Sequence, residues 1–178
     1  HKYKINLISI SKESVASKSK DLNKLLKTIG SNISFLDHQK FNYKYNFKHH
    51  QGIVIEFSGE ITKELNEVIS FEENACYIIC DQINDPQNLG QIIRTSECAG
   101  IDGIILPKHG SVHITDSVIQ VSQGAFFNLD IFVETNLNNT IKYLQSKGFW
   151  VVGVENGIDA DIWYNIDYKG KIVIAMTI

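Results

Sequence analysis

YIICDQINDPQNLGQIIRTSECAGIDGIILP, the stretch at residues 77–107, contains the pattern that decides the fold. Residues 77–80 form a short apolar run rich in strand-forming residues, and the Asp85-Pro86 pair ends that strand. The apolar positions that follow have a helical period, with Asn88 placed as the helix cap and Gly100 as the C-terminal stop. A second apolar run at 103–106 completes a strand–helix–strand unit, which predicts a βαβ crossover.

The polar residues of this unit are candidates for a functional site. Arg94 is predicted to lie within the helix, near the carboxyl ends of the strands, where open α/β sheets bind ligands. Asn88 either caps the helix or contacts a ligand, and Gly90 leaves room for a nucleic-acid backbone to approach the helix N-terminus. Glu97 follows Arg94 by three residues, so it could tether the arginine, and an ordinary surface ion pair is the alternative interpretation.

Strands and helices alternate regularly through the rest of the chain. Further strands are expected at 129–133, 149–154 and 171–176, with helices at 115–123 and 137–147. Because strands separated by helices pair in parallel, we predict an α/β fold with a mostly parallel sheet.

The residues before this sheet predict a smaller α/β unit. It contains strands at 5–10, 33–36 and 52–57 and a lysine-rich helix at 17–29. We place an N-terminal domain at 1–57, a linker at 58–73 that is helical on Leu65, Val68 and Ile69, and a second domain at 74–178.

Charge divides the chain into two unlike parts. Residues 1–50 contain ten lysines and three acids, whereas residues 51–178 contain seven basic and seventeen acidic residues. The corresponding net charges, +7 and −10, add to the −3 of the whole chain. A lysine-rich unit can neutralise phosphates, so we expect RNA contacts from Lys40, Lys44 and Lys48, with Tyr43, Tyr45 and Phe47 as base-stacking surfaces. Alternating aromatic residues are equally typical of one face of a β-strand.

Composition excludes several classes of function. No apolar run approaches the roughly 20 residues of a membrane span, and the N-terminus lacks the order of a signal peptide, so we expect a cytoplasmic protein without a membrane partner. The three cysteines form neither a Cys-x-x-Cys motif nor a disulfide set and are expected to be small buried residues. His109 and His113 have the i, i+4 spacing of metal ligands, but Gly110 and Ser111 interrupt a helix there, and we expect no metal. The glycine-rich motifs of dinucleotide and nucleoside-triphosphate sites are absent from the sequence.

Residues 85–100, DPQNLGQIIRTSECAG, resemble motif 1 of the SpoU (TrmH-like) RNA 2′-O-ribose methyltransferases. That motif has the pattern Asp-Pro-x-Asn-x-Gly-x-Ile-x-Arg-Thr and opens the catalytic domain of the family. Two weaker similarities flank it. HQGIV at 50–54 is similar to the end of the family's N-terminal substrate-binding domain, and 122–133 is similar to a Ser-x-Gly-Ala helix end with its following strand.

The resemblance implies a catalytic α/β domain of the SPOUT type, with a C-terminal trefoil knot that binds S-adenosylmethionine, in a homodimer. Arg94 would be the catalytic residue, supported by Asn88 and Glu97, and Val154 and Glu155 would lie where family members contact the adenosine. The Asn-Gly turn at 156–157 explains that last stretch equally well. Motifs 2 and 3, which build most of the cofactor pocket, do not appear before residue 178. We therefore expect the knot segment to be missing from this chain, either because the sequence shown is incomplete, which we favour, or because the protein lacks the pocket.

The leading hypothesis is transfer of a methyl group from S-adenosylmethionine to a ribose 2′-hydroxyl of RNA. Because a guanidinium is almost never neutral in a protein, we expect Arg94 to fix a phosphate or hydroxyl and stabilise a nascent alkoxide. The N-terminal segment is most similar to the group that methylates a guanosine of bacterial large-subunit rRNA, with tRNA as the alternative substrate. Two other classes stay open: a catalytically silent RNA-binding protein of the same fold, and an α/β small-molecule binder.

Overall fold

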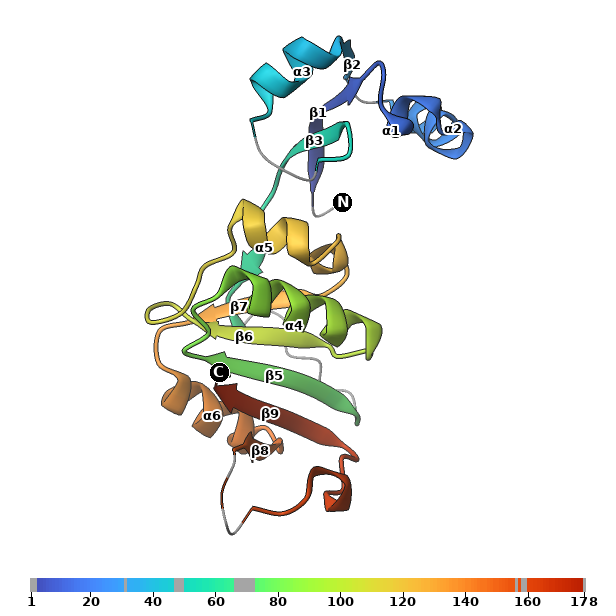
Figure 1. Cartoon of the computed structure of the whole chain (residues 1–178). Coiled ribbons are helices and arrows are strands. Elements are labelled where there is room, and N and C mark those ends of the chain that lie inside the picture. The colour runs from blue at the N-terminus through green and yellow to red at the C-terminus, as the bar shows by residue number, and fades with distance from the viewer. Residues whose placement is uncertain are drawn as a thin grey trace. The chain divides into compact units, whose positions relative to one another are not determined.

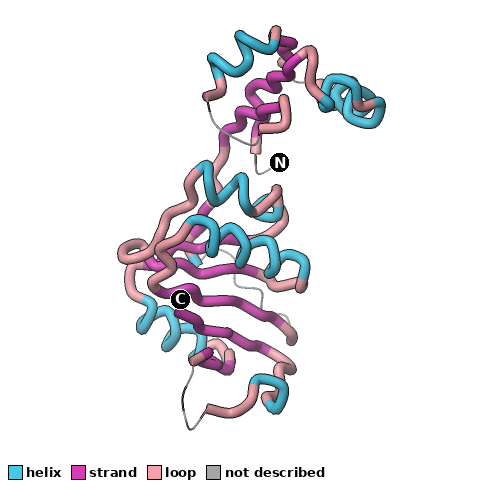
Figure 2. Tube along the Cα trace, viewed as in Figure 1, coloured by secondary structure: helices cyan, strands magenta, loops and turns pink. Residues whose placement is uncertain are grey.

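The computed structural model describes residues 3–30, 32–46, 50–65, 73–155, 157 and 160–177. It divides into two units, His1–Glu60 and Ile61–Ile178, whose elements are shown in Figures 1 and 2. The boundary falls inside the stretch predicted as a linker. Within that stretch Thr62–Lys63 form strand β4, which was not predicted from the sequence. Val68 and Ile69, which define the helix predicted in this stretch, lie outside the described residues.

The first unit is built on a three-stranded sheet. Strand β1 (Lys4–Ser11) lies in the middle, parallel to β2 (Ile33–Leu36) and antiparallel to β3 (Ile53–Ser58). Three helices accompany the sheet: α1 (Val15–Lys18), α2 (Lys20–Ile29) and α3 (His38–Lys44). The single helix predicted at 17–29 is thus two helices. Ser19 interrupts it with an extended backbone, and its hydroxyl accepts a hydrogen bond from the backbone N–H of Leu22, which caps α2.

The second unit contains a six-stranded sheet in which every described pairing is parallel. Its order is β4-β7-β6-β5-β9-β8, with β5 at Ala75–Asp81, β6 at Gly103–Pro107, β7 at Asp130–Glu134, β8 at Trp150–Val154 and β9 at Lys171–Thr177. The helices are α4 (Pro86–Cys98), α5 (Asp116–Val121) and α6 (Leu137–Ser146), with short 3₁₀ turns η2 (Ala125–Phe127) and η3 (Trp163–Asn165). No helix in the described part of the chain is long and apolar enough to cross a membrane.

Helices cover both faces of this sheet. Helix α6 packs against one face, where Leu144 joins a core cluster with Tyr77, Phe132 and Phe149. The ring centroids of Phe132 and Phe149 lie 6.0 and 5.6 Å from that of Tyr77. Helices α4 and α5 lie on the opposite face (Figure 1). This two-sided burial explains why the central strands are continuous apolar runs rather than alternating ones.

Helix α4 begins earlier than the sequence predicts. Its N-cap is Asp85, whose carboxylate accepts a hydrogen bond of 2.8 Å from the backbone N–H of Gln87, and Pro86 is its first residue. The prediction that Asn88 caps the helix is therefore wrong, since Asn88 lies within the first turn. At the other end Gly100 has φ +73° and donates its N–H to the Glu97 carbonyl, as predicted for a C-terminal stop.

Candidate functional site

The loops that follow β5 and β6 lie at the carboxyl ends of these parallel strands, where α4 begins. Parallel strands end at the same edge, so residues 82–85 and 108–115 lie on one side of the second unit. The backbone N–H of Val112 donates a 2.7 Å hydrogen bond to the Ile83 carbonyl, and the Ile83 side chain is buried. These contacts tie the two loops together and fix the start of α4 relative to the sheet.

Arg94 projects from the middle of α4 and is exposed. It is the only arginine of the 178-residue sequence, in which the other sixteen basic residues are lysines. Within the described part of the chain its guanidinium makes no hydrogen bond or ion pair. Five N–H donors held on a rigid helix are consequently available to an anionic ligand such as a phosphate.

Glu97 does not tether Arg94, so this prediction is wrong, as is its alternative of a surface ion pair. The Glu97 carboxylate instead accepts a 3.0 Å hydrogen bond from the side-chain amide of Asn128, which follows η2. The contact joins α4 to η2. It turns the Glu97 carboxylate toward Asn128, although a spacing of three residues on a helix would also allow it to reach the guanidinium of Arg94. Asn128 is a site neighbour that sequence patterns do not reveal, because it lies 31 residues away along the chain.

Asn88 and Arg94 lie on different sides of α4. A helix turns by about 100° per residue, so six residues place the two side chains roughly 120° apart around the axis. The exposed residues Gln87 and Gln91 share the side of Arg94, at spacings of seven and three residues. Asn88 remains exposed and could contact RNA from the helix start, but the structure does not bring it next to Arg94. Gln87 and Gln91 could have been found from the helical period of the sequence.

Gly90 does not face a ligand, which corrects its predicted contact with RNA. It is buried where α4 crosses α5, and a Cβ placed there would lie 2.5 Å from Cβ and 2.6 Å from Cγ1 of Val121. It would also lie 3.2 Å from the carbonyl oxygen of Val118. The glycine is therefore required by helix–helix packing.

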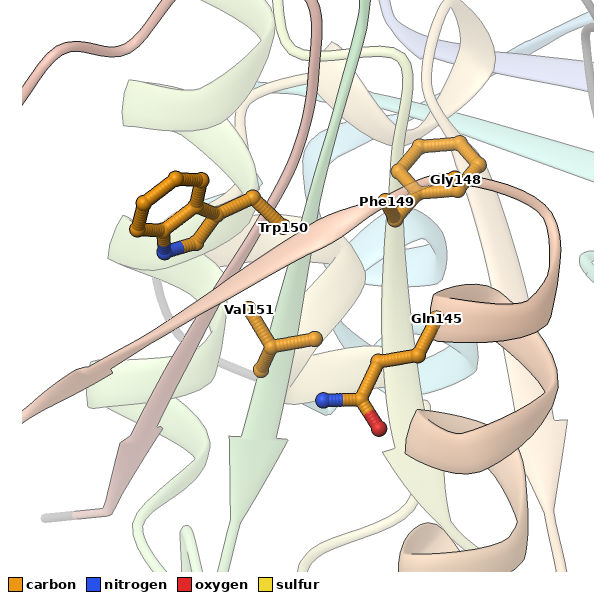
Figure 3. A pocket seen from close by; sticks show the side chains of 5 residues that line it. All are labelled: Gln145, Gly148, Phe149, Trp150 and Val151. Carbon is orange, nitrogen blue, oxygen red and sulfur yellow. The ribbon is translucent and has the colours of Figure 1, made fainter.

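Val154 and Glu155, the predicted cofactor contacts, lie at the carboxyl end of β8. Both are exposed, and Val154 pairs in register with Met176 of β9. The hollow of about 420 Å³ shown in Figure 3 lies at the other end of β8, where Val151 and Gln145 lie on one side of the strand and Trp150 on the other. A second hollow of about 350 Å³ lies beside the loop that joins β7 to α6.

The lysines predicted to bind RNA have different surroundings. Lys40 is exposed on α3, whereas the Lys44 ammonium lies 3.1 Å from the Glu56 carboxylate and 4.8 Å from the ring centre of Tyr45. The Tyr45 hydroxyl donates a 2.6 Å hydrogen bond to Glu56 and lies 2.7 Å from the Ser9 hydroxyl. Hydrogen bonds from Tyr45 and then Lys44 hold the pKa of Glu56 below its usual value.

Tyr45 is buried, so its prediction as a base-stacking surface is wrong. Tyr43 is 91% exposed and keeps that possibility. Residues 43 and 44 end helix α3, so the alternative of a β-strand at this place is wrong as well. Phe47 and Lys48 lie outside the described residues.

The cysteines differ in burial. Cys80 is buried, and burial raises the pKa of its thiol to about 12, while Cys98 is exposed, contrary to the prediction for all three. Among the residues that the structure describes, no group of three His, Cys, Asp or Glu side chains is placed to hold a metal ion.

Comparison with known proteins identifies the family. The model of the SpoU rRNA methylase family matches residues 75–176, which is more than half of the chain. The chain belongs to this family.

Named relatives agree with that assignment. The chain is 36% identical over 153 residues to a protein of Shewanella oneidensis named 23S rRNA (guanosine-2′-O-)-methyltransferase RlmB. The aligned region covers 84% of this chain and 62% of the relative. A Bacillus subtilis protein named as a putative TrmH family tRNA/rRNA methyltransferase is 28% identical, over 98% of this chain and 70% of the relative. The chain thus spans about three fifths of the length of the RlmB relative.

Solved structures share the fold. An rRNA methyltransferase from Sinorhizobium meliloti superimposes with a TM-score of 0.74 at 22% identity, over 98% of this chain and 64% of that one. The SpoU methyltransferase AviRb from Streptomyces viridochromogenes gives 0.77 at 16% identity, over 98% of this chain and 65% of that one. The prediction of a SpoU-type α/β fold with a mostly parallel sheet is thereby confirmed.

Proposed function

We propose that the protein transfers a methyl group from S-adenosylmethionine to a ribose 2′-hydroxyl of RNA, and that the substrate is a guanosine of bacterial large-subunit rRNA. Membership of the SpoU rRNA methylase family supports the reaction class. The name of the Shewanella oneidensis relative supports the substrate, and tRNA remains the second candidate because the Bacillus subtilis relative is named for both RNAs. The observation that carries the proposal is the exposed, unpaired Arg94 in the motif of this family.

Arg94 supplies a fixed positive charge. An arginine can form two parallel hydrogen bonds to a phosphate, which would hold the nucleotide beside the helix. The same charge stabilises a ribose oxygen as it loses its proton, an effect that in enzymes is worth about 10²- to 10³-fold in rate for one donor. The roles proposed for Asn88 and Glu97 are weaker: Asn88 lies on another side of the helix, and Glu97 acts only by remaining bound to Asn128.

S-adenosylmethionine would supply an electrophilic methyl group. An AdoMet-bound structure of the Sinorhizobium meliloti methyltransferase shows that a protein of this fold binds it. In this chain, Val154 and Glu155 are exposed at the end of an edge strand, and both hollows described above are lined by other residues. Neither of these two hollows therefore places a ligand against Val154 and Glu155.

The test is transfer of a labelled methyl group from S-adenosylmethionine to a transcript of bacterial large-subunit rRNA. A ribose 2′-O-methyl group blocks alkaline cleavage of the adjacent phosphodiester, so digestion should leave the label in a dinucleotide. Label recovered in mononucleotides would indicate methylation of a base and contradict the proposal. A tRNA transcript in a parallel reaction separates the two candidate substrates.

A catalytically silent RNA-binding protein is the second candidate, because the lysine-rich first unit would bind RNA whether or not the methyl donor binds. Calorimetric titration with S-adenosylmethionine separates the two functions. Heat of binding supports the enzyme, whereas RNA binding without heat of cofactor binding supports the silent protein.

Two further features belong to the proposal. Action on ribosomal RNA would place the protein in the cytoplasm. Homodimer formation is suggested by the apolar side chains that β8 exposes, among them Trp150 at 72% and Val154 at 52%. Sedimentation equilibrium should give twice the chain mass of 20.1 kDa, and a monomer at every concentration would contradict a dimer.

A further inference from the structure

Helix α2 has two faces of opposite character. Its apolar side chains Leu22, Leu26 and Ile29 pack with Ile8 and Ile10 of β1, and Leu26 is buried there. With a turn of about 100° per residue, Lys20, Lys24 and Lys27 fall within roughly 60° of one another on the side opposite to those apolar residues. All three lysines are exposed. Packing against β1 thus forces them to point away from the core.

The lysines of α2 are also free of acidic partners. None of Lys20, Lys24 and Lys27 makes an ion pair or hydrogen bond with another described residue. Asp21 is the only acid on the helix and lies at the edge of this face. By contrast, Lys12 lies 2.9 Å from Asp37, and Lys44 is paired with Glu56. Acidic partners therefore neutralise Lys12 and Lys44, whereas the three lysines of α2 keep their charges uncompensated.

We propose that Lys20, Lys24 and Lys27, the α2 lysine face, bind the phosphate backbone of the RNA substrate. This inference rests on the proposed function, because it assigns the substrate contact within the first unit. It moves the main electrostatic contact away from Lys44, whose charge Glu56 already compensates.

The spacing of the face suits a polyanion. Seven residues of helix separate its ends, which corresponds to about 10 Å along the axis. One strand of a nucleic-acid double helix has a phosphate about every 3.4 Å of axis, so roughly three phosphates lie within reach. Each neutralised phosphate contributes about 0.7 to 0.9 to the slope of log affinity against log salt concentration. Three lysines should account for about 2 to 3 of that slope.

The test compares the full chain with the variant K20Q/K24Q/K27Q. Glutamine has nearly the helix propensity of lysine, so α2 should remain folded, which circular dichroism checks. Binding to a large-subunit rRNA transcript is measured by fluorescence anisotropy between 50 and 200 mM salt. Across that fourfold range the wild type should lose about 16- to 64-fold more affinity than the variant, since their slopes differ by about 2 to 3.

The matched control is K4Q/K142Q/K169Q, which removes three other exposed lysines and changes the net charge equally. The inference predicts that its slope stays near that of the wild type, and that K20R/K24R/K27R also keeps the slope. An equal loss of slope in both triple-glutamine variants would overturn the inference, as would salt-independent binding of the wild type. Stronger wild-type binding to vesicles containing phosphatidylserine than to RNA would assign the face to a membrane instead and also overturn it.

Failure of this inference can be told apart from failure of the proposed reaction. An Arg94→Lys variant keeps the charge and should keep the salt slope whether or not it transfers methyl groups. If the wild type transfers no methyl group and K20Q/K24Q/K27Q reduces the salt slope of RNA binding, the α2 lysine face is confirmed and the proposed reaction is rejected.

Discussion

Replacing Gly90 by alanine should destabilise the second unit, although alanine is the better helix former. A Cβ at this position would lie 2.5 and 2.6 Å from two carbons of Val121, against an ordinary contact of about 3.5 to 4.0 Å. Helix α5 would have to move by roughly 1 Å, and overpacking of this kind costs about 1–3 kcal/mol. The gain in helix propensity offsets about 1 kcal/mol. We expect Gly90→Ala to lower the free energy of unfolding by about 1 kcal/mol.

Urea unfolding followed by tryptophan fluorescence measures this change. Both tryptophans, Trp150 and Trp163, lie in the second unit, so their emission reports that unit. Gly153 provides the matched control, because a Cβ there would meet no atom within 4 Å and its φ is not left-handed. Gly153→Ala should be neutral or stabilise by up to about 1 kcal/mol.

The double variant Gly90→Ala/Val121→Gly moves the small residue from α4 to α5. It should recover about 1 kcal/mol relative to the sum of the two single changes if the contact between them is the cause. A Gly90→Ala protein that is as stable as the wild type would refute the role assigned to this glycine.

The remaining predictions concern single side chains. Glu56 accepts hydrogen bonds from Tyr45 and Lys44 at the end of α3, and these lower the pKa of its carboxyl group from the usual 4.5. The ionised carboxylate therefore stabilises the folded state fully above pH 4.5, and this contribution is lost as the pH falls through the lowered pKa. Acid unfolding of the first unit should therefore be less steep in Glu56→Gln, and an unchanged profile would reject the pair. Iodoacetamide at pH 8 should alkylate Cys98 in the folded protein, because this thiol is exposed, and should not alkylate Cys80. Burial protects Cys80 and raises the pKa of its thiol to about 12, and mass spectra of tryptic peptides check both residues. Asn128→Ala should lower methyl transfer about twofold, because the released Glu97 can form a helix ion pair with Arg94 of about 0.3–0.5 kcal/mol. Adding Glu97→Gln to that variant removes the ion pair and should restore the transfer rate. A loss of transfer that Glu97→Gln does not repair would contradict this explanation.

The sequence predicts most of the second unit well because its central strands are buried on both faces. Continuous apolar runs bounded by turns locate β5, β6, β7, β8 and β9, and the alternation with helices predicts parallel pairing. The start of α4 was within reach of the sequence, since an Asp before a Pro matches an N-cap followed by the first helical residue. Asn88 is an equally good capping type three residues later, and residue preference alone does not choose between them.

Helix α3 shows why the first unit is harder to predict. The residues Tyr43 and Tyr45 fit the period of a strand, yet Phe41 and Tyr45, four residues apart, form the buried side of a helix end. A spacing of four residues fits one face of a strand as well as one face of a helix, so tertiary packing decides in so short a segment.

The site shows the same limit. Sequence similarity singles out Arg94, but the partner of Glu97 and the contact of Gly90 with α5 depend on which segments meet in space. Those contacts involve residues about 30 positions apart and have no local signal.

The central claim is that Arg94 acts on an RNA ribose during methyl transfer. The most direct measurement compares the wild type with Arg94→Lys for labelled methyl transfer to large-subunit rRNA, together with RNA affinity and its salt dependence. Lysine keeps the charge but loses the two parallel hydrogen bonds that hold the nucleotide in place, so transfer should fall by about 10²-fold through misplacement of the ribose, while the salt dependence of RNA binding and the stability of the protein stay unchanged. Full transfer by Arg94→Lys would contradict the role proposed for the only arginine of the chain.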